Sequence, residues 1–67
     1  MQYTVVVDGV TLRASSDRVV SYCSDWLRVS DLEAQGFLTH KHYPALYGHV
    51  DYILTDKAIR EASRIAA

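Results

Sequence analysis

The sequence predicts a small α+β domain in which short helices pack on antiparallel strands. Three observations lead to this fold class. An Asp8-Gly9 pair joins two alternating apolar segments, a second pair of alternating segments flanks Pro44, and helix-capping patterns begin at Ser30 and Thr55. The expected order is hairpin, helix, possible second short helix, hairpin and helix, or ββα(α)ββα. A length of 67 residues allows one domain, residues 1–67.

Residues 2–14 predict the first hairpin. Asp-Gly is the preferred pair for a two-residue type I′ turn, since both central positions need positive φ. Such a turn places six side chains on one face, which we expect to be buried, in the pairs Val7–Val10, Val5–Leu12 and Tyr3–Ala14. The outer edge of this hairpin stays open in the prediction. It offers a pairing edge to a second copy of the chain.

The middle of the chain predicts helical structure. Ser15-Ser16-Asp17 is typical of a helix start, and apolar residues follow it at helical spacing: Val19, Cys23, Trp26 and Leu27. A capping-box pattern from Ser30 to Glu33 favours a second, short helix, and Gly36 is expected to end it. Whether the first helix continues through Ser30 is left open by the sequence.

Residues 37–43 and 48–54 predict a second hairpin with a four-residue loop, 44–47. That loop length places His42 opposite His49 and His40 opposite Asp51. Thr55-Asp56 then predicts the start of a last helix, whose inner stripe is formed by Ala58, Ile59, Ala62, Ile65 and Ala66.

The register of the second hairpin predicts a polar patch with metal-ligand chemistry. Cross-strand neighbours have Cβ atoms about 5 Å apart, so four side chains converge on one face: His40, His42, His49 and Asp51. Imidazole nitrogen and carboxylate oxygen are zinc ligands, which makes a zinc site one interpretation. The other interpretation is a solvated polar face with no cofactor.

Composition limits the class of function. Seven Lys+Arg against eight Asp+Glu give a formal charge of −1, without the basic excess typical of nucleic-acid binders. The single Cys23 excludes an intrachain disulfide and, lying on an apolar stripe with no base beside it, predicts no enzyme activity. No apolar segment is long enough to span a membrane, and we expect a cytoplasmic, intracellular protein that does not bind membranes. A core this small favours a homodimer.

The loop of the second hairpin predicts a binding surface. Tyr43, Leu46 and Tyr47 lie at or beside a loop tip, where apolar side chains are hard to bury. Aromatic residues of this kind dominate the binding energy of protein interfaces, and a polar rim of Lys41, His42, His49 and Asp51 surrounds them. The alternative is that the three apolar residues fold back on the C-terminal helix.

A second pattern extends over residues 31–62. It comprises Leu32, Glu33, Gly36 and Leu38, followed by Leu54, Thr55 and Lys57. This part of the chain resembles the segment of recognition helix, wing hairpin and following helix in winged-helix repressors of the multiple-antibiotic-resistance type. Ala58 stands where that family has glycine, and the wing has one lysine and no arginine. The resemblance implies a DNA-binding regulator with Ser24, Arg28 and Lys41 beside the DNA.

The leading hypothesis is a small, non-catalytic regulatory or inhibitor protein. It docks on a macromolecular target, either a protein or a nucleoprotein complex. In size and compactness the chain resembles the accessory and inhibitor proteins encoded by phages and mobile elements, such as anti-CRISPR proteins. The alternative is the diverged winged-helix DNA-binding transcriptional regulator.

Overall fold

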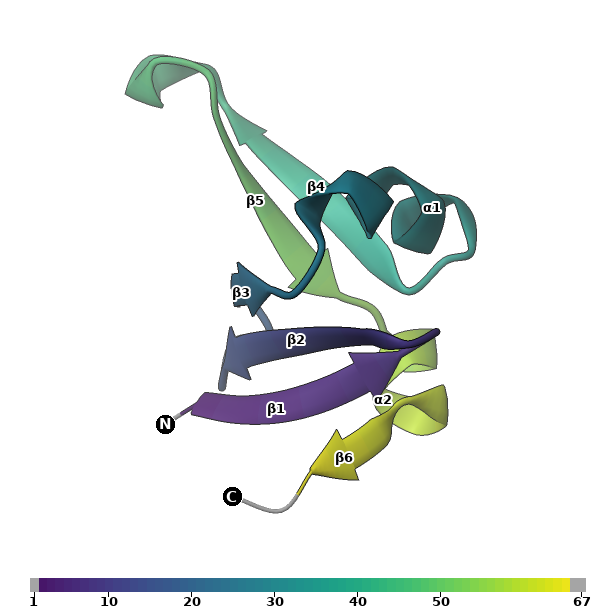
Figure 1. Ribbon diagram of the computed structural model, residues 1–67. Coiled ribbons are helices and arrows are strands. Elements are labelled where there is room, and N and C mark those ends of the chain that lie inside the picture. The colour runs from purple at the N-terminus through teal and green to yellow at the C-terminus, as the bar shows by residue number, and fades with distance from the viewer. Residues whose placement is uncertain (1, 66–67) are drawn as a thin grey trace.

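The α+β class is confirmed by a computed structural model, which describes the backbone of residues 2–65 and the side chains of residues 2–62. Figure 1 shows a four-stranded antiparallel sheet, in the order β3-β2-β1-β6, and a separate β4–β5 hairpin that projects from it. The elements are β1 (Gln2–Val7), β2 (Val10–Ser15), β3 (Val20–Cys23), the 3₁₀ helix η1 (Trp26–Arg28), α1 (Val29–Ala34), β4 (Leu38–Tyr43), the 3₁₀ helix η2 (Pro44–Leu46), β5 (His49–Leu54), α2 (Asp56–Glu61) and β6 (Ser63–Ile65).

The β1–β2 hairpin has the predicted register. Asp8 and Gly9 both have positive φ, and the expected cross-strand pairs are all present. Five of the six predicted inward side chains are buried, and Tyr3 packs partly against them. Together with side chains from β3, α1, β4, β5 and α2, they form the core: Val5, Val7, Val10, Leu12, Ala14, Cys23, Val29, Leu32, Leu38, Leu54 and Ala58.

The helix predicted from Ser15 to Leu27 is wrong. Asp17 accepts hydrogen bonds from the Ser15 hydroxyl and the Val19 amide, and Arg18 takes a left-handed conformation with φ of 70°. These contacts make a tight turn, after which β3 pairs with β2. Ser and Asp favour turns and helix caps by the same side-chain hydrogen bonds, and the β-branched Val20 favours the strand.

A short helix is confirmed here as α1, and Gly36 ends it as predicted. The predicted cap at Ser30 is wrong, because the helix begins at Val29, with Arg28 as an N-cap that makes no side-chain hydrogen bond. The Gly36 amide donates to the Glu33 carbonyl and the Phe37 amide donates to the Leu32 carbonyl. This pair of bonds, with Gly36 at φ of 86°, is a Schellman motif. It turns the chain sharply into β4.

The second hairpin is confirmed, but its predicted register is wrong by one residue. Tyr43 lies opposite His49, so the loop contains residues 44–48 rather than 44–47. Tyr47 and Gly48 both have positive φ, which removes Gly48 from the extended strand. Because side chains alternate along a strand, a shift of one residue changes which side chains share a face.

The last helix begins at the predicted cap, since the Thr55 hydroxyl accepts a hydrogen bond from the Ala58 amide. Its predicted continuation is wrong. The helix ends at Glu61, and β6, which includes Ile65, pairs with β1; Ala66 lies outside the described residues. This pairing satisfies backbone groups of β1 that the helix would have left open. With β3 on one side and β6 on the other, the predicted open edge of the first hairpin is also wrong, and a homodimer stays a prediction.

The two sheets are joined at the base of the projecting hairpin. Val19 and Ile53 form an isolated antiparallel bridge, and the Leu54 amide donates to the Arg18 carbonyl at 2.9 Å. The Arg18 side chain also pairs with Asp56 at the start of α2, at 2.6 Å. These contacts attach the base of β5 to the body, while its distal half extends away from it (Figure 1).

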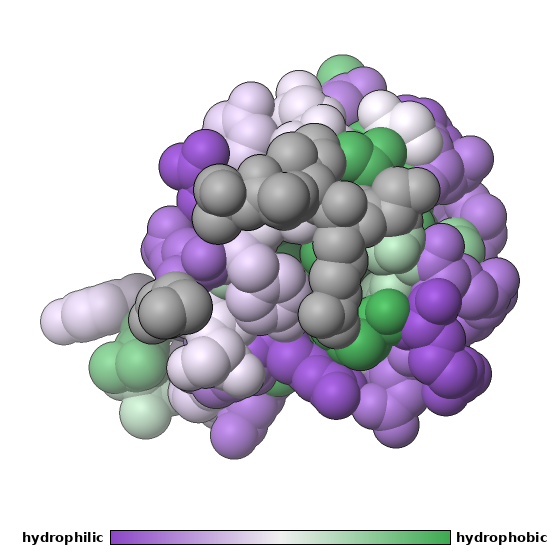
Figure 2. All heavy atoms as spheres, turned by 90° about the horizontal axis from the view of Figure 1, so that it is seen from below, coloured by the Kyte–Doolittle hydropathy of each residue, from purple (hydrophilic) through white to green (hydrophobic). Residues whose placement is uncertain are grey.

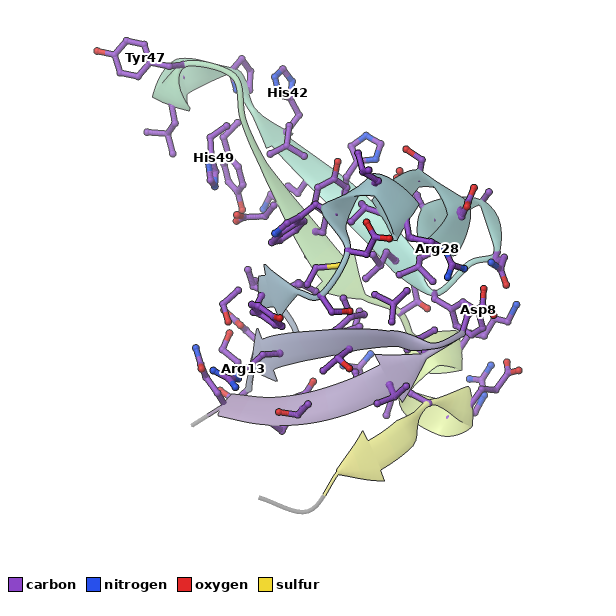
Figure 3. The ribbon with its side chains drawn as sticks, in the orientation of Figure 1. Asp8, Arg13, Arg28, His42, Tyr47 and His49 are labelled. Atoms are coloured by element: carbon purple, nitrogen blue, oxygen red, sulfur yellow. The ribbon has the colours of Figure 1, made fainter. Side chains whose placement is uncertain are left out.

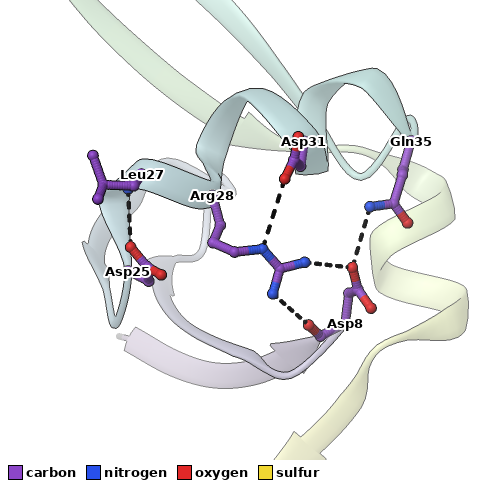
Figure 4. A network of polar contacts seen from close by, with 6 residues as sticks. All are labelled: Asp8, Asp25, Leu27, Arg28, Asp31 and Gln35. Carbon is purple, nitrogen blue, oxygen red and sulfur yellow. Dashed lines mark hydrogen bonds and ion pairs between the residues drawn. The ribbon is translucent and has the colours of Figure 1, made fainter.

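A polar network connects the first turn to the helical segment (Figure 4). Asp8 accepts from Arg28 at 2.6 Å and from the Gln35 amide at 3.2 Å, and Arg28 lies 3.8 Å from Asp31. The hydrogen bond from Gln35 and the charge and hydrogen bond of Arg28 hold the pKa of Asp8 below its usual value. A carboxyl group whose pKa is lowered by folding stabilises the fold only while it is ionised.

We expect the Asp8→Asn variant to lose part of the pH dependence of unfolding below about pH 4, near the carboxyl pKa of unfolded chains. The stabilisation from ionised Asp8 is present above the unfolded pKa and disappears as pH falls through the lower folded pKa. Urea denaturation between pH 2 and 7 measures this. Asp25→Asn, an exposed carboxylate of the same helical segment, serves as the matched control. Equal acid slopes for the wild type and Asp8→Asn would contradict the assigned role of Asp8.

Candidate functional site

The hairpin tip, defined here as residues 43–48, carries Tyr47, the most exposed large apolar side chain among the described residues. Leu46 is 58% exposed and Tyr47 is fully exposed. Tyr47 also has φ of 56° and ψ of 36°, a left-handed conformation that costs a residue with a Cβ atom about 1–2 kcal/mol. Strained, exposed aromatic residues are typical of functional positions, so the tip is the first candidate site.

The tip lies far from the C-terminal helix. Figure 1 shows it at the end of the long β4–β5 ribbon, and Figure 3 shows the Tyr47 ring pointing outward. In the view of Figure 2 it forms the projection at the left edge, where hydrophobic atoms extend beyond the body. The alternative that Leu46 and Tyr47 fold back on the last helix is therefore wrong.

One face of the hairpin carries an aromatic and charged cluster below the tip. Lys41 Nζ lies 5.2 Å from the centre of the Tyr43 ring, and the Tyr43 and His49 rings are 6.0 Å apart. His49 Nε2 is 2.7 Å from Asp51 Oδ1. Tyr43 is half-buried by these neighbours, while Lys41 and His49 remain exposed. Lys41 and His49 of the predicted rim thus lie beside Tyr43, with the Lys41 cation over its ring, whereas His42 lies on the other face of the hairpin.

The predicted metal cluster is wrong because the observed register divides it between two faces. His40 and His42 lie opposite Tyr52 and Val50, whereas His49 and Asp51 lie on the other face of the hairpin. Figure 3 shows His42 and His49 on opposite sides of the ribbon. His40 instead contacts Glu33 of α1. The residues that the structure describes include no group of three or more ligand side chains suited to a metal ion.

The residues behind the winged-helix resemblance lie together at the base of the hairpin. Thr55 Oγ1 donates to the Gly36 carbonyl at 2.5 Å, and the Thr55 amide donates to the Phe37 carbonyl at 3.1 Å. Lys57 Nζ donates to the Gln35 carbonyl at 2.5 Å and lies 4.6 Å from the Phe37 ring centre. These contacts join the end of α1 to the start of α2, and we call them the basal clamp. The motif therefore has a structural role in this chain.

The residues predicted to lie beside DNA are dispersed. Ser24 bonds to the Thr11 amide through its hydroxyl at 3.0 Å, and Arg28 is paired with Asp8 and Asp31. Lys41 lies on β4, in a different element from the other two. Arg28 would have to leave two carboxylates before it could contact a phosphate.

Two further exposed apolar residues were not predicted as surface features. Trp26 and Leu27 lie on the 3₁₀ helix η1, and Leu27 is 92% exposed. The apolar spacing predicts a helix with both side chains on its inner stripe. Because that helix does not form, the exposure of the two side chains was not predicted. The nearby Asp25, whose carboxylate caps η1 through the Leu27 amide, was the available signal.

Comparisons of the chain with protein-family models, with curated proteins and with solved structures found no match.

Cys23 is buried, at 3% exposure, among the apolar residues of the core, which is the predicted environment. Over residues 2–65, none of the helices has the length and apolar character required to cross a bilayer. No pocket is detected in the part of the chain that the structure describes. The protruding tip is therefore the candidate functional site.

We expect Tyr47→Gly to make the fold more stable by about 0.5–1 kcal/mol. Glycine removes the cost of the left-handed conformation, partly offset by its greater freedom in the unfolded chain, and a fully exposed ring contributes no burial. Urea denaturation measures the change. Gly48→Ala is the matched control and should be destabilised, since Gly48 has φ of 75°. A clear loss of stability in Tyr47→Gly would instead assign Tyr47 a structural role.

Proposed function

We propose that this chain is a small non-catalytic regulator that binds a macromolecular target, most directly a protein, through its hairpin tip. Leu46 and Tyr47 are the apolar anchors, and Tyr43 supports them from the strand. Lys41, His42 and His49 form the polar rim. Binding acts by steric occlusion of the target's own working surface. Inhibitor proteins of phages and mobile elements, such as anti-CRISPR proteins, work in this manner on cytoplasmic protein or nucleoprotein targets. We propose that this chain is encoded by a phage or mobile element as well.

One observation carries the proposal: an exposed Leu46-Tyr47 pair at the end of a projecting hairpin, with Tyr47 in the left-handed conformation. Every residue from 44 to 50 is exposed, so the pair contributes nothing to the core. An aromatic side chain has only two rotatable bonds to fix on binding and supplies a large contact area. A tip of this shape enters a concave surface on another molecule without rearrangement of the body that holds it.

The test begins with a photo-crosslinking amino acid at position 47, used in an extract of the source organism to capture the target. The same amino acid at Arg13, at the opposite end of the molecule in Figure 3, is the control for non-specific capture. The affinity of the purified target is then measured by calorimetry for the wild type and for the Leu46→Ala/Tyr47→Ala variant. We expect the double variant to bind about 100-fold more weakly or worse, because central anchors each contribute about 2 kcal/mol or more.

The Leu27→Ala/Tyr22→Ala variant is the matched control, because it removes the same two side-chain types from exposed positions outside the hairpin. It should bind the target as the wild type does. Circular dichroism of all three proteins establishes that each is folded. If the tip variant keeps full affinity while folded, the tip is not the docking site and the proposal fails.

A winged-helix DNA-binding regulator, acting as a dimer, is the second candidate. The observation in its favour is the order α1, β4–β5 hairpin and capped α2, which is the order of segments in that family's recognition helix, wing and following helix. Against it stand a net charge of −1 and a wing with a single lysine.

Fluorescence anisotropy of labelled duplex DNA at low and near-physiological salt separates the two candidates. For a protein-docking tip we expect no binding at either salt concentration. Affinity that falls steeply as salt rises would show phosphate contacts and favour the winged-helix candidate. In that case Lys41→Ala should weaken binding, whereas Leu46→Ala should not.

A further inference from the structure

Charge is divided unevenly between the projecting hairpin and the body. The distal hairpin, defined as residues 39–50, contains Lys41 and three histidines and no acidic residue. Its formal charge is therefore +1, and the rest of the chain, with six Lys+Arg against eight Asp+Glu, carries −2. All residues of the distal hairpin except Tyr43 are exposed. Two acids contact its histidines: Asp51, immediately beyond its end, contacts His49, and Glu33 of α1 contacts His40 at the base.

Two cations lie over tyrosine rings, Lys41 on the hairpin and Arg13 on β2, whereas three cations of the body are held by oxygen atoms. Arg18 and Arg28 are paired with carboxylates, and Lys57 binds a backbone carbonyl in the basal clamp. Lys41 on β4 lies directly opposite Asp51 on β5, but the Asp51 carboxylate contacts His49 instead. Among the described residues, Lys41 makes no ion pair, and its ammonium group lies on the Tyr43 ring. A cation held against an aromatic ring beside the tip is positioned to meet a carboxylate on a partner.

We propose that the hairpin tip recognises an acidic protein surface, in which carboxylates surround an apolar depression that receives Leu46 and Tyr47. This inference rests on the proposed function and specifies its partner class. Lys41 supplies the fixed positive charge on one face of the hairpin, and the imidazole of His42 supplies an N–H donor on the opposite face. The body, with its net negative charge, is repelled by the same surface, so the hairpin is the part that approaches first.

A protein surface fits these features better than a nucleic acid does. Phosphate binding gains affinity mainly from the number of cations that contact the backbone, and the distal hairpin has one. The branched aliphatic Leu46, beside Tyr47 at the extreme tip, fits an apolar depression and gains nothing from phosphate. Tyrosine rings stack on the bases of single-stranded nucleic acid, so the test must also measure whether the tip binds such a strand.

A phage-displayed library of random peptides, selected on the purified full-length chain, tests this inference. Selected peptides are measured by fluorescence anisotropy against the wild type, Leu46→Ala/Tyr47→Ala, Lys41→Glu and Arg13→Glu. We expect peptides that combine Asp or Glu with aliphatic or aromatic residues. They should bind Lys41→Glu about tenfold more weakly and lose most binding to the tip variant. Arg13→Glu makes the same charge change on β2, away from the tip, and should leave affinity unchanged.

The remaining outcomes separate the two proposals. Peptides that require Leu46 and Tyr47 but are not acidic, or are indifferent to Lys41→Glu, overturn the acidic partner and leave tip docking in place. Peptides that bind the tip variant as well as the wild type overturn both. Enrichment of no peptide overturns the acidic partner, as does tip-dependent binding of a labelled single-stranded oligonucleotide at low salt.

Discussion

The basal clamp is the contact on which the rest of this architecture depends. It joins the residues immediately before β4, Gln35 to Phe37, to the residues immediately after β5, Thr55 and Lys57. A two-stranded hairpin is marginal by itself in water, so its direction must be fixed by what holds its two ends. The clamp does this with one capped helix start, one Schellman turn and a lysine across the carbonyl end of α1. The Val19–Ile53 bridge then fixes the same end against the larger sheet.

Fixing only one end has a consequence for the other. The buried side chains of the hairpin, Leu38 and Leu54, are opposite each other at its base. Tyr52 still packs partly against the core. Beyond it the strands leave the core, and the ladder of backbone hydrogen bonds with a few cross-strand side-chain contacts holds the shape. The left-handed Tyr47 and Gly48 complete the turn and set the register of that ladder. The register in turn groups Lys41, Tyr43 and His49 on one face and His42 on the other, which determines the chemistry that the tip presents.

The sequence predicts the parts of this fold in which one local signal has one meaning. Asp8-Gly9 specifies a type I′ turn, and so the register of the first hairpin is predicted to the residue, although β2 extends one residue further, to Ser15. Gly36 and Thr55 are equally unambiguous as the end and start of helices. The failures arise where a signal has two physical meanings. Ser15 to Asp17 can cap a helix or close a turn with the same hydrogen bonds, and tertiary pairing of Val20 with Ala14 selects the turn. Pairing of β6 with β1 likewise depends on contacts distant in sequence, and it shortens the last helix.

The candidate site also combines residues whose placement follows from one clear local signal with residues whose placement does not. The sequence predicts the place of Leu46 and Tyr47 beside Pro44 in a loop, but it leaves open whether they are exposed or fold back on the last helix, and the structure shows them exposed. The grouping of the histidines depends on whether Gly48 belongs to the loop or to the strand, a choice of one residue that reverses every face beyond it. The zinc hypothesis failed on that choice alone, although its residue types were suitable. The docking hypothesis depends on the loop itself, whose two anchor residues are adjacent, and it is insensitive to register. A tip made in this way can vary its anchors and charges without disturbing the core, because the residues that specify the fold lie at the other end of the hairpin.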